Sequence, residues 1–228
     1  MRFIRALVVI AALGASTVSA ARADTIMFMD SVPLQPTNFM SSVTLPKFDP
    51  NLGILEKVTV KLAGHVEGMA QFESLDAEPA VVTMELAAEV KLQRPDMSTL
   101  VVTLPLIMTM DNATAFDGVI DFAGTSGKSY PLLTADDTNM FMTMDMMDLA
   151  LFTGPGNIML PVMATGASTG SGAGNLLLQF STSASANVMV TYDYIIPEPA
   201  TAGLLSLGAF TFARRRRRRA VQIAAHLT

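Results

Sequence analysis

"KVTVKLAGHV", residues 57–66, is the stretch that decides the fold. Apolar side chains occupy every second position of its first half, at Val58, Val60 and Leu62, and polar residues stand between them. Successive side chains of a strand point to opposite faces. A period of two therefore predicts a β-strand that buries one face and exposes the other.

The same pattern continues along the chain. "NVMVTYDY", residues 187–194, alternates in the same way, and further strand-length runs cover residues 80–92, 99–110 and 156–164. Short alternating runs between Gly, Pro, Asn and Asp predict an all-β single domain, an antiparallel β-sandwich or jelly roll. Residues 84–92 would also accommodate a turn or two of helix, although we favour a strand. The Gly/Ser-rich residues 165–175 predict a mobile loop.

The N-terminal residues have the order of a secretory signal. Arg2 and Arg5 precede an apolar run, and small residues ending in Ala21-Arg22-Ala23 follow it. This order predicts a signal peptide over residues 1–23, cleaved after Ala23, with Ala20 as the second choice. Residues 24–196 are then one exported domain.

The C-terminal residues are "PEPATAGLLSLGAFTFARRRRRRA", 197–220. As a helix, residues 200–213 would span about 21 Å, which is short for a hydrocarbon core of about 30 Å. We expect a short transmembrane helix with its cationic end in the cytoplasm, and a cytoplasmic tail at 220–228. The residues expected to stop translocation are Arg214, Arg215, Arg216, Arg217, Arg218 and Arg219.

Pro197, Glu198 and Pro199, followed by the hydrophobic segment and the arginines, closely resemble the PEP-CTERM sorting signal of Gram-negative bacteria. The resemblance implies a precursor that the general secretion machinery inserts into the inner membrane. An integral-membrane exosortase would then cleave near the motif, leaving the mature protein at the cell surface or secreted. The alternative is an ordinary single-pass anchor.

The core has a resemblance of its own. "LPKFDPNLGILEKVTVKLAG", 45–64, and "LALFTGPGNIMLPVMATGASTGSGAGN", 149–175, resemble choice-of-anchor E domains. This resemblance implies an extracellular β-fold, with no activity established for the family and no catalytic residues to carry over. We interpret Phe48-Asp49-Pro50 and Gly53 as a structural turn, because proline presets φ and glycine is permissive.

Residues 24–196 are strongly acidic. The whole chain carries 15 Lys+Arg and 20 Asp+Glu. Nine of the cations (Arg2, Arg5, Arg22 and the six tail arginines) and one anion (Glu198) lie outside residues 24–196, which therefore keep 6 cations and 19 anions, a net charge of −13. Nucleic acid is an improbable partner for such a surface, because its phosphates require cations. The chain has no cysteine, which excludes thiol catalysis and zinc–thiolate sites, and His65 is the single histidine of residues 24–196.

Three motifs suggest chemistry. "GTSGKS", 124–129, resembles a phosphate loop, but the glycine that the pattern requires is Phe122, so we expect a surface loop. Met140, Met142, Met144 and Met146 would share one face of a strand, and thioethers select Cu(I). Met27, Met29, Met108 and Met110 repeat the spacing. Methionine is also an adaptable core filler, and we favour core packing for these rows.

Carboxylates gather loosely in three regions. Calcium takes six to eight oxygens from such loops, so structural calcium stays open, although we favour solvated acidic loops and expect no metal or cofactor. The carboxylates concerned are Asp111, Asp117, Asp121, Asp136, Asp137, Asp145 and Asp148.

We therefore expect an exported, exosortase-sorted protein of the cell surface or extracellular matrix, without catalytic activity. The alternative is a carbohydrate- or calcium-binding adhesin module that contacts extracellular polysaccharide.

Overall fold

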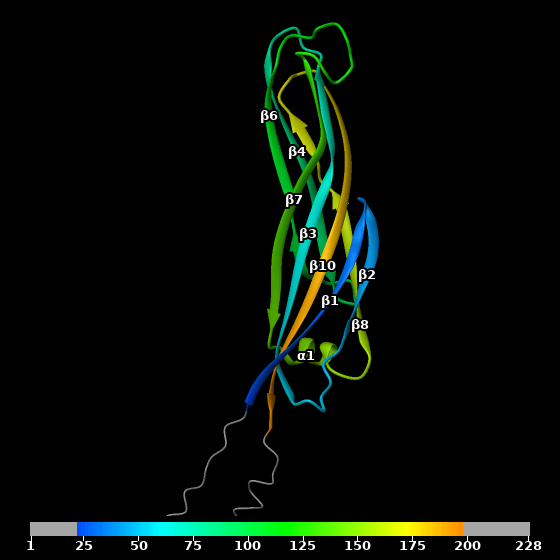
Figure 1. Cartoon of the computed structure of the whole chain (residues 1–228), viewed down its shortest axis with the longest axis vertical. Helices are drawn as coiled ribbons and strands as arrows, with labels where there is room; N and C mark the ends of the chain where they lie inside the picture. Colours follow the sequence, from blue (N-terminus) through cyan, green and yellow to red (C-terminus); the bar gives the residue numbers. More distant parts are fainter. Residues whose placement is uncertain (1–21, 198–228) are drawn as a thin grey trace, which may run out of the picture. The chain divides into compact units, whose positions relative to one another are not determined.

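The computed structural model describes residues 22–197, and these are almost entirely strands (Figure 1). The chain divides into two compact units, Ala23–Ile195 and the two terminal segments Met1–Arg22 with Ile196–Thr228. The terminal unit lies mostly outside the described residues. With it lie the expected signal and transmembrane helices, Glu198, Pro199 and the arginine cluster. Within residues 22–197, no helix is long and apolar enough to cross a bilayer.

The described elements comprise ten strands and one short helix. Their bounds are β1 Arg22–Pro36, β2 Phe39–Pro46, β3 Ile54–Ser74, β4 Ala80–Gln93, β5 Thr99–Thr103, β6 Leu106–Ala113, β7 Gly127–Thr143, α1 Met146–Phe152, β8 Asn157–Gly166, β9 Thr169–Ser171 and β10 Leu176–Ile196.

The strands form two antiparallel sheets packed into a sandwich, as predicted. One sheet has the order β1-β10-β3-β7, and the other has the order β2-β8-β4-β5, with β6 and β9 also paired to β4. The longest strands, β3 and β10, pair from Ile195 opposite Ile54 to Leu176 opposite Ser74. We call the end of the sandwich at Ile54 and Ile195 the base, and the end at Ser74 and Leu176 the tip.

The core follows the alternation of the sequence. Val58, Val60 and Leu62 of β3 are fully buried, and Val190 and Val188 of β10 lie opposite Val60 and Leu62 with their side chains on the same inner face. Burial of one face in each of two stacked sheets is what holds a sandwich together. The prediction from residues 57–66 is confirmed.

The two ambiguous segments have separate outcomes. Residues 84–92 lie in β4, so the strand assignment is confirmed. The loop prediction for residues 165–175 is wrong in part, because residues 165–166 end β8 and Thr169–Ser171 form β9. Ser171 pairs with Thr83 and Thr169 with Glu85. This short strand supplies hydrogen-bond partners to the part of β4 that β8 does not reach.

Candidate functional site

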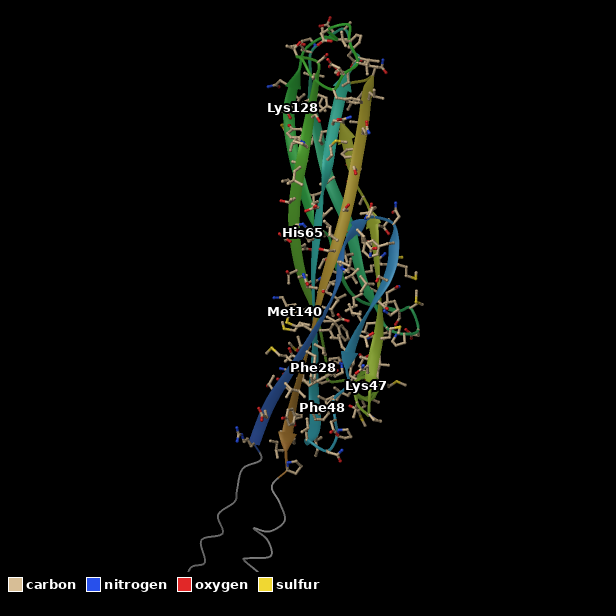
Figure 2. The ribbon with its side chains drawn as sticks, turned by 45° about the vertical axis from the view of Figure 1, so that its right-hand side comes forward. Phe28, Lys47, Phe48, His65, Lys128 and Met140 are labelled. Carbon is tan, nitrogen blue, oxygen red and sulfur yellow. The ribbon has the colours of Figure 1, made fainter. Side chains whose placement is uncertain are left out.

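An aromatic cluster fills the base of the sandwich. The ring of Tyr192, on the inner face of β10, lies 5.9 Å from Phe48, 6.1 Å from Phe28 and 6.4 Å from Phe152. Tilted and edge-on contacts at these separations are favourable for aromatic pairs. Figure 2 shows Phe28 and Phe48 together at this end. The cluster joins β1, α1 and β10 to the segment before β3.

Tyr192 also makes the cluster's polar contact. Its hydroxyl donates a hydrogen bond to the carbonyl oxygen of Pro46 at 2.8 Å. Burial raises the pKa of the Tyr192 phenol above its usual range, so the group remains a protonated donor. This bond fixes the chain where β2 ends.

Residues 47–53, which we call the base turn, connect β2 to β3. The amide of Phe48 donates to the Phe152 carbonyl at 2.8 Å, and Asp49 Oδ1 accepts from the Asn51 amide at 2.9 Å and from its side chain at 2.8 Å. The Leu52 amide donates to the Asp49 carbonyl at 3.0 Å. An Asp that bonds the backbone two residues later stabilises a turn, so the turn predicted around Pro50 is confirmed.

Gly53 lets the base turn approach the last residues of β10. A Cβ atom at Gly53 would lie 2.2 Å from the carbonyl oxygen of Ile195. The adjacent Ile54 is the register partner of Ile195, and Tyr194 packs 5.1 Å from the Phe48 ring. The chain is therefore held by packing and pairing as far as Ile195.

The predicted sorting motif follows at once. β10 ends at Ile196, and Pro197 is an exposed residue after the strand. One residue therefore separates the last paired residue of the sandwich from the motif. At the other end of the chain, Ala23 lies exposed in β1, two residues before Thr25, whose hydroxyl donates to Asp193 at 2.7 Å.

The prediction that the methionine rows pack in the core is wrong. Met140 is 58% and Met144 66% exposed, and Figure 2 shows Met140 on the outside of its sheet. Met140 and Met142 of β7 lie opposite Lys61 and Thr59, the solvent-facing residues of β3. The sequence reading failed because alternation gives two faces and does not say which one is buried.

Further methionines share this exposure, and one departs from the predicted geometry. β7 ends at Thr143, so Met146 lies in α1, away from the strand row. The other rows that the sequence singled out are also exposed; they are Met27, Met29, Met108 and Met110.

The acidic residues singled out in the sequence lie in separate local contacts. Asp111 pairs with Lys128, and Asp117 and Asp121 each accept from the backbone two residues later. Asp148 pairs with Arg94 at 2.9 Å. Asp145 caps α1. Within the part of the chain that the structure describes, no group of three or more His, Asp or Glu side chains could hold a metal ion.

Two of these carboxylates lie on β7. Asp136 Oδ1 accepts a hydrogen bond from His65 Nδ1 at 2.8 Å, and Glu67 Oε2 lies 3.6 Å from His65 Nε2. Asp137 Oδ2 accepts the Leu104 amide at 2.8 Å. Asn139 Nδ2 donates to the Val102 carbonyl at 2.9 Å. The last two contacts connect the edge strand β7 to the opposite sheet.

Sequence reasoning missed one buried carboxylate. Glu73 is fully buried near the tip, where it accepts from the Ser126 hydroxyl at 2.6 Å and from the Phe122 amide at 2.8 Å. In the "GTSGKS" segment, residues 124–126 form a turn and residues 127–129 begin β7, so the surface-loop prediction is wrong in part. The buried Ser126 bonds Glu73, and Lys128 pairs with Asp111. No sequence signal marked Glu73, because it directly follows the inward-facing Phe72.

Comparisons with known proteins identify the C-terminal segment. Residues 196–218 match the model of the PEP-CTERM protein-sorting motif. This match supports an exported, membrane-transiting precursor that an exosortase processes. No curated protein matches the chain.

Structures of infectious bursal disease virus are among the solved structures that match. The infectious bursal disease virus VP2 subviral particle is 14% identical over 91% of this chain and 54% of that one, with a TM-score of 0.19. The Gx strain of the same virus is 12% identical over 91% and 53%, with a TM-score of 0.19. The chain thus spans about half the length of these proteins.

Proposed function

We propose that this chain is a cell-surface or extracellular-matrix protein whose sandwich is carried to its destination by exosortase processing and performs no catalysis. The observation that carries the proposal is the position of the sorting motif, whose Pro197 is separated by one residue from Ile195, the last paired residue of the sandwich. The domain is thereby complete without the residues that processing would remove.

The base supports the link between the domain and its sorting segment. The two segments that resemble choice-of-anchor E domains meet there, since Phe48 of the first forms a bridge with Thr153 of the second. We therefore include choice-of-anchor E membership in the proposal. In such a domain, residues 24–196 are the exported part and residues 1–23 the cleaved signal.

A non-catalytic role agrees with how the polar side chains are used. The carboxylates at the tip and on β7 bond backbone amides or cations of the protein itself. Tyr192 and Tyr194, two of the three tyrosines, are buried in the base and so offer no stacking platform to a sugar. No observation favours the adhesin alternative over a structural role.

Substitution of the motif tests the proposal. In a host that contains an exosortase, Glu198→Ala should leave uncleaved precursor in the membrane fraction, while the wild-type chain is shortened and released from that fraction. Glu78→Ala is a control that removes one carboxylate from an exposed loop between β3 and β4. Equal processing of Glu198→Ala and wild type would contradict the proposal.

A further inference from the structure

The base carries exposed apolar side chains beside the point where the chain leaves the sandwich. Leu52, in the base turn, is 44% exposed, and Ile54, at the start of β3, is 57% exposed. Ile54 is the register partner of Ile195. Ile54 therefore lies beside the end of β10, next to the residue that leads into the sorting motif, and Leu52 precedes it by two residues.

The base turn holds these side chains in a fixed arrangement. Asp49 accepts from the Asn51 amide and side chain, and the Leu52 amide donates back to the Asp49 carbonyl. Gly53 packs on the Ile195 carbonyl. A surface fixed before binding loses little conformational entropy when a partner covers it.

The length of chain after β10 limits what can cover this surface in the precursor. Four residues, 196–199, separate Ile195 from Ala200, where the hydrophobic segment begins. Fully extended, the five steps from Ile195 to Ala200 reach about 17 Å. An enzyme that engages the motif must work within that reach of the base.

We propose that the base of the sandwich, centred on Leu52 and Ile54, is a second recognition surface for the membrane-embedded exosortase that processes the motif. This inference rests on the proposed function. The enzyme would read a composite of the motif and the folded base, so that only a folded domain is processed efficiently.

The charge of the domain favours a protein partner over the lipid surface. Residues 24–196 carry a net charge of −13, and bilayers with anionic lipids repel acidic proteins. Leu52 and Ile54 are exposed apolar side chains two residues apart, and covering apolar side chains with a partner protein removes them from water, which favours binding.

A pair of double variants of the full chain tests the inference. Leu52→Asp/Ile54→Asp places two charges at the base. Val119→Asp/Ile120→Asp places two charges in the loop between β6 and β7, on side chains that are 56% and 55% exposed. The two sites lie at opposite ends of β3, about 60 Å apart at the usual rise of a strand, so the control matches charge and exposure but not position.

Pulse–chase labelling in the exosortase-containing host measures the rate of processing, and limited proteolysis of the precursor in membranes measures folding. We expect the base variant to be processed at least about fivefold more slowly than the control, the effect of losing one or two central interface side chains, with equal protease resistance. Processing of both at the wild-type rate would overturn the inference. Loss of protease resistance in the base variant is resolved by Leu52→Gln/Ile54→Thr, which removes the apolar surface without added charge and should show the same slowing.

Two further arms separate the explanations. A six-residue Gly/Ser insertion between Ile196 and Pro197 should slow processing and make it insensitive to the base substitutions. Faster processing would show that the base obstructs the enzyme and would overturn the inference.

Vesicles of phosphatidylethanolamine and phosphatidylglycerol test whether the base binds lipid instead. Co-sedimentation of the wild-type mature protein with these vesicles, but not of the base variant, would assign the surface to lipid and overturn the inference. Glu198→Ala is run in parallel and tests the proposed function separately. Normal processing of that variant would show that processing does not depend on the motif, and the proposed function itself would then fail.

Discussion

At the scale of single residues, the base depends on a glycine that no side chain can replace without movement. The Ile195 carbonyl occupies the space of a Cβ at Gly53, and backbone atoms cannot rotate aside as a side chain does. A Cβ at Gly53 would also lie 3.0 Å from the Tyr194 ring, which packs on Phe48. Residue 53 therefore couples the base turn to the end of β10.

Gly53→Ala should consequently destabilise the exported domain by about 1–3 kcal/mol, as overpacking does. Gly154→Ala is the control, because Gly154 also has a positive φ, of 131°, but a Cβ there meets nothing within 4 Å. Denaturant unfolding followed by circular dichroism measures both. A loss at Gly53 no larger than that at Gly154 would show that the contact with Ile195 carries no energy.

A second residue-scale prediction concerns Asp193 on the outer face of β10. The hydrogen bond from Lys57, then that from the Thr25 hydroxyl, holds the pKa of Asp193 below its usual value. A carboxyl with a lowered folded-state pKa contributes stability above its unfolded pKa, near 4, and loses that stability as the pH falls through the folded value.

We therefore expect Asp193→Asn to lower the melting temperature at pH 7 and to have progressively less effect below about pH 4. The pair is partly exposed, so the change should be small. Asp24→Asn, on the neighbouring strand β1 and without an ion pair among the described contacts, is the control. A difference between wild type and Asp193→Asn that grows on acidification has the opposite sign and would contradict this account.

At the scale of elements, the alternating strands were predictable, but their buried faces were predictable only for some of them. Residues 57–66 and 187–194 carry β-branched and apolar side chains against charged and hydroxyl ones, so the buried face is evident from chemistry. In residues 139–144 one face carries methionines and the other carries Asn, Phe and Thr. Hydrophobicity alone predicts burial of the methionine face, which is the exposed face in the structure. The structure turns Phe141 and Thr143 inward and the methionines outward.

Oxidation distinguishes these two faces directly. Dilute hydrogen peroxide, applied to the folded protein, should convert Met140, Met142 and Met144 to sulfoxides while Met84 of β4, which is 0% exposed, stays unmodified. Peptide mass spectrometry reads each site, and the same treatment in denaturant is the control in which Met84 must react. Oxidation of Met84 as fast as Met140 in the native protein would contradict the placement of β7.

Long-range contacts limited the rest of the element-scale prediction. β9 forms because β4 extends beyond β8, which is a fact of register that residues 165–175 do not contain. Glu73 is buried because Ser126 and Phe122, about fifty residues later, return to it. The base turn was predictable for the converse reason, since the bonds from Asn51 and Leu52 to Asp49 that form the turn itself lie within residues 49–52.

At the scale of the whole molecule, different segments of the chain determine the fold and the sorting. Residues 57–66 and the other alternating segments predict the sandwich, and residues 196–218 match the sorting motif. The structure adds how closely the two are joined, because pairing continues to Ile195 and the motif begins at Pro197. That spacing could not be read from the sequence, where the end of the last strand is uncertain by several residues.

The central claim is that the sorting segment is removed and the sandwich is delivered without it. Intact mass spectrometry of the protein recovered from the cell surface and the medium tests this most directly, because it gives the C-terminal residue. We predict a product that ends near Pro197-Glu198-Pro199 and lacks residues 200–219. A surface protein that retains residues 200–219 would contradict the claim and make the segment a permanent anchor.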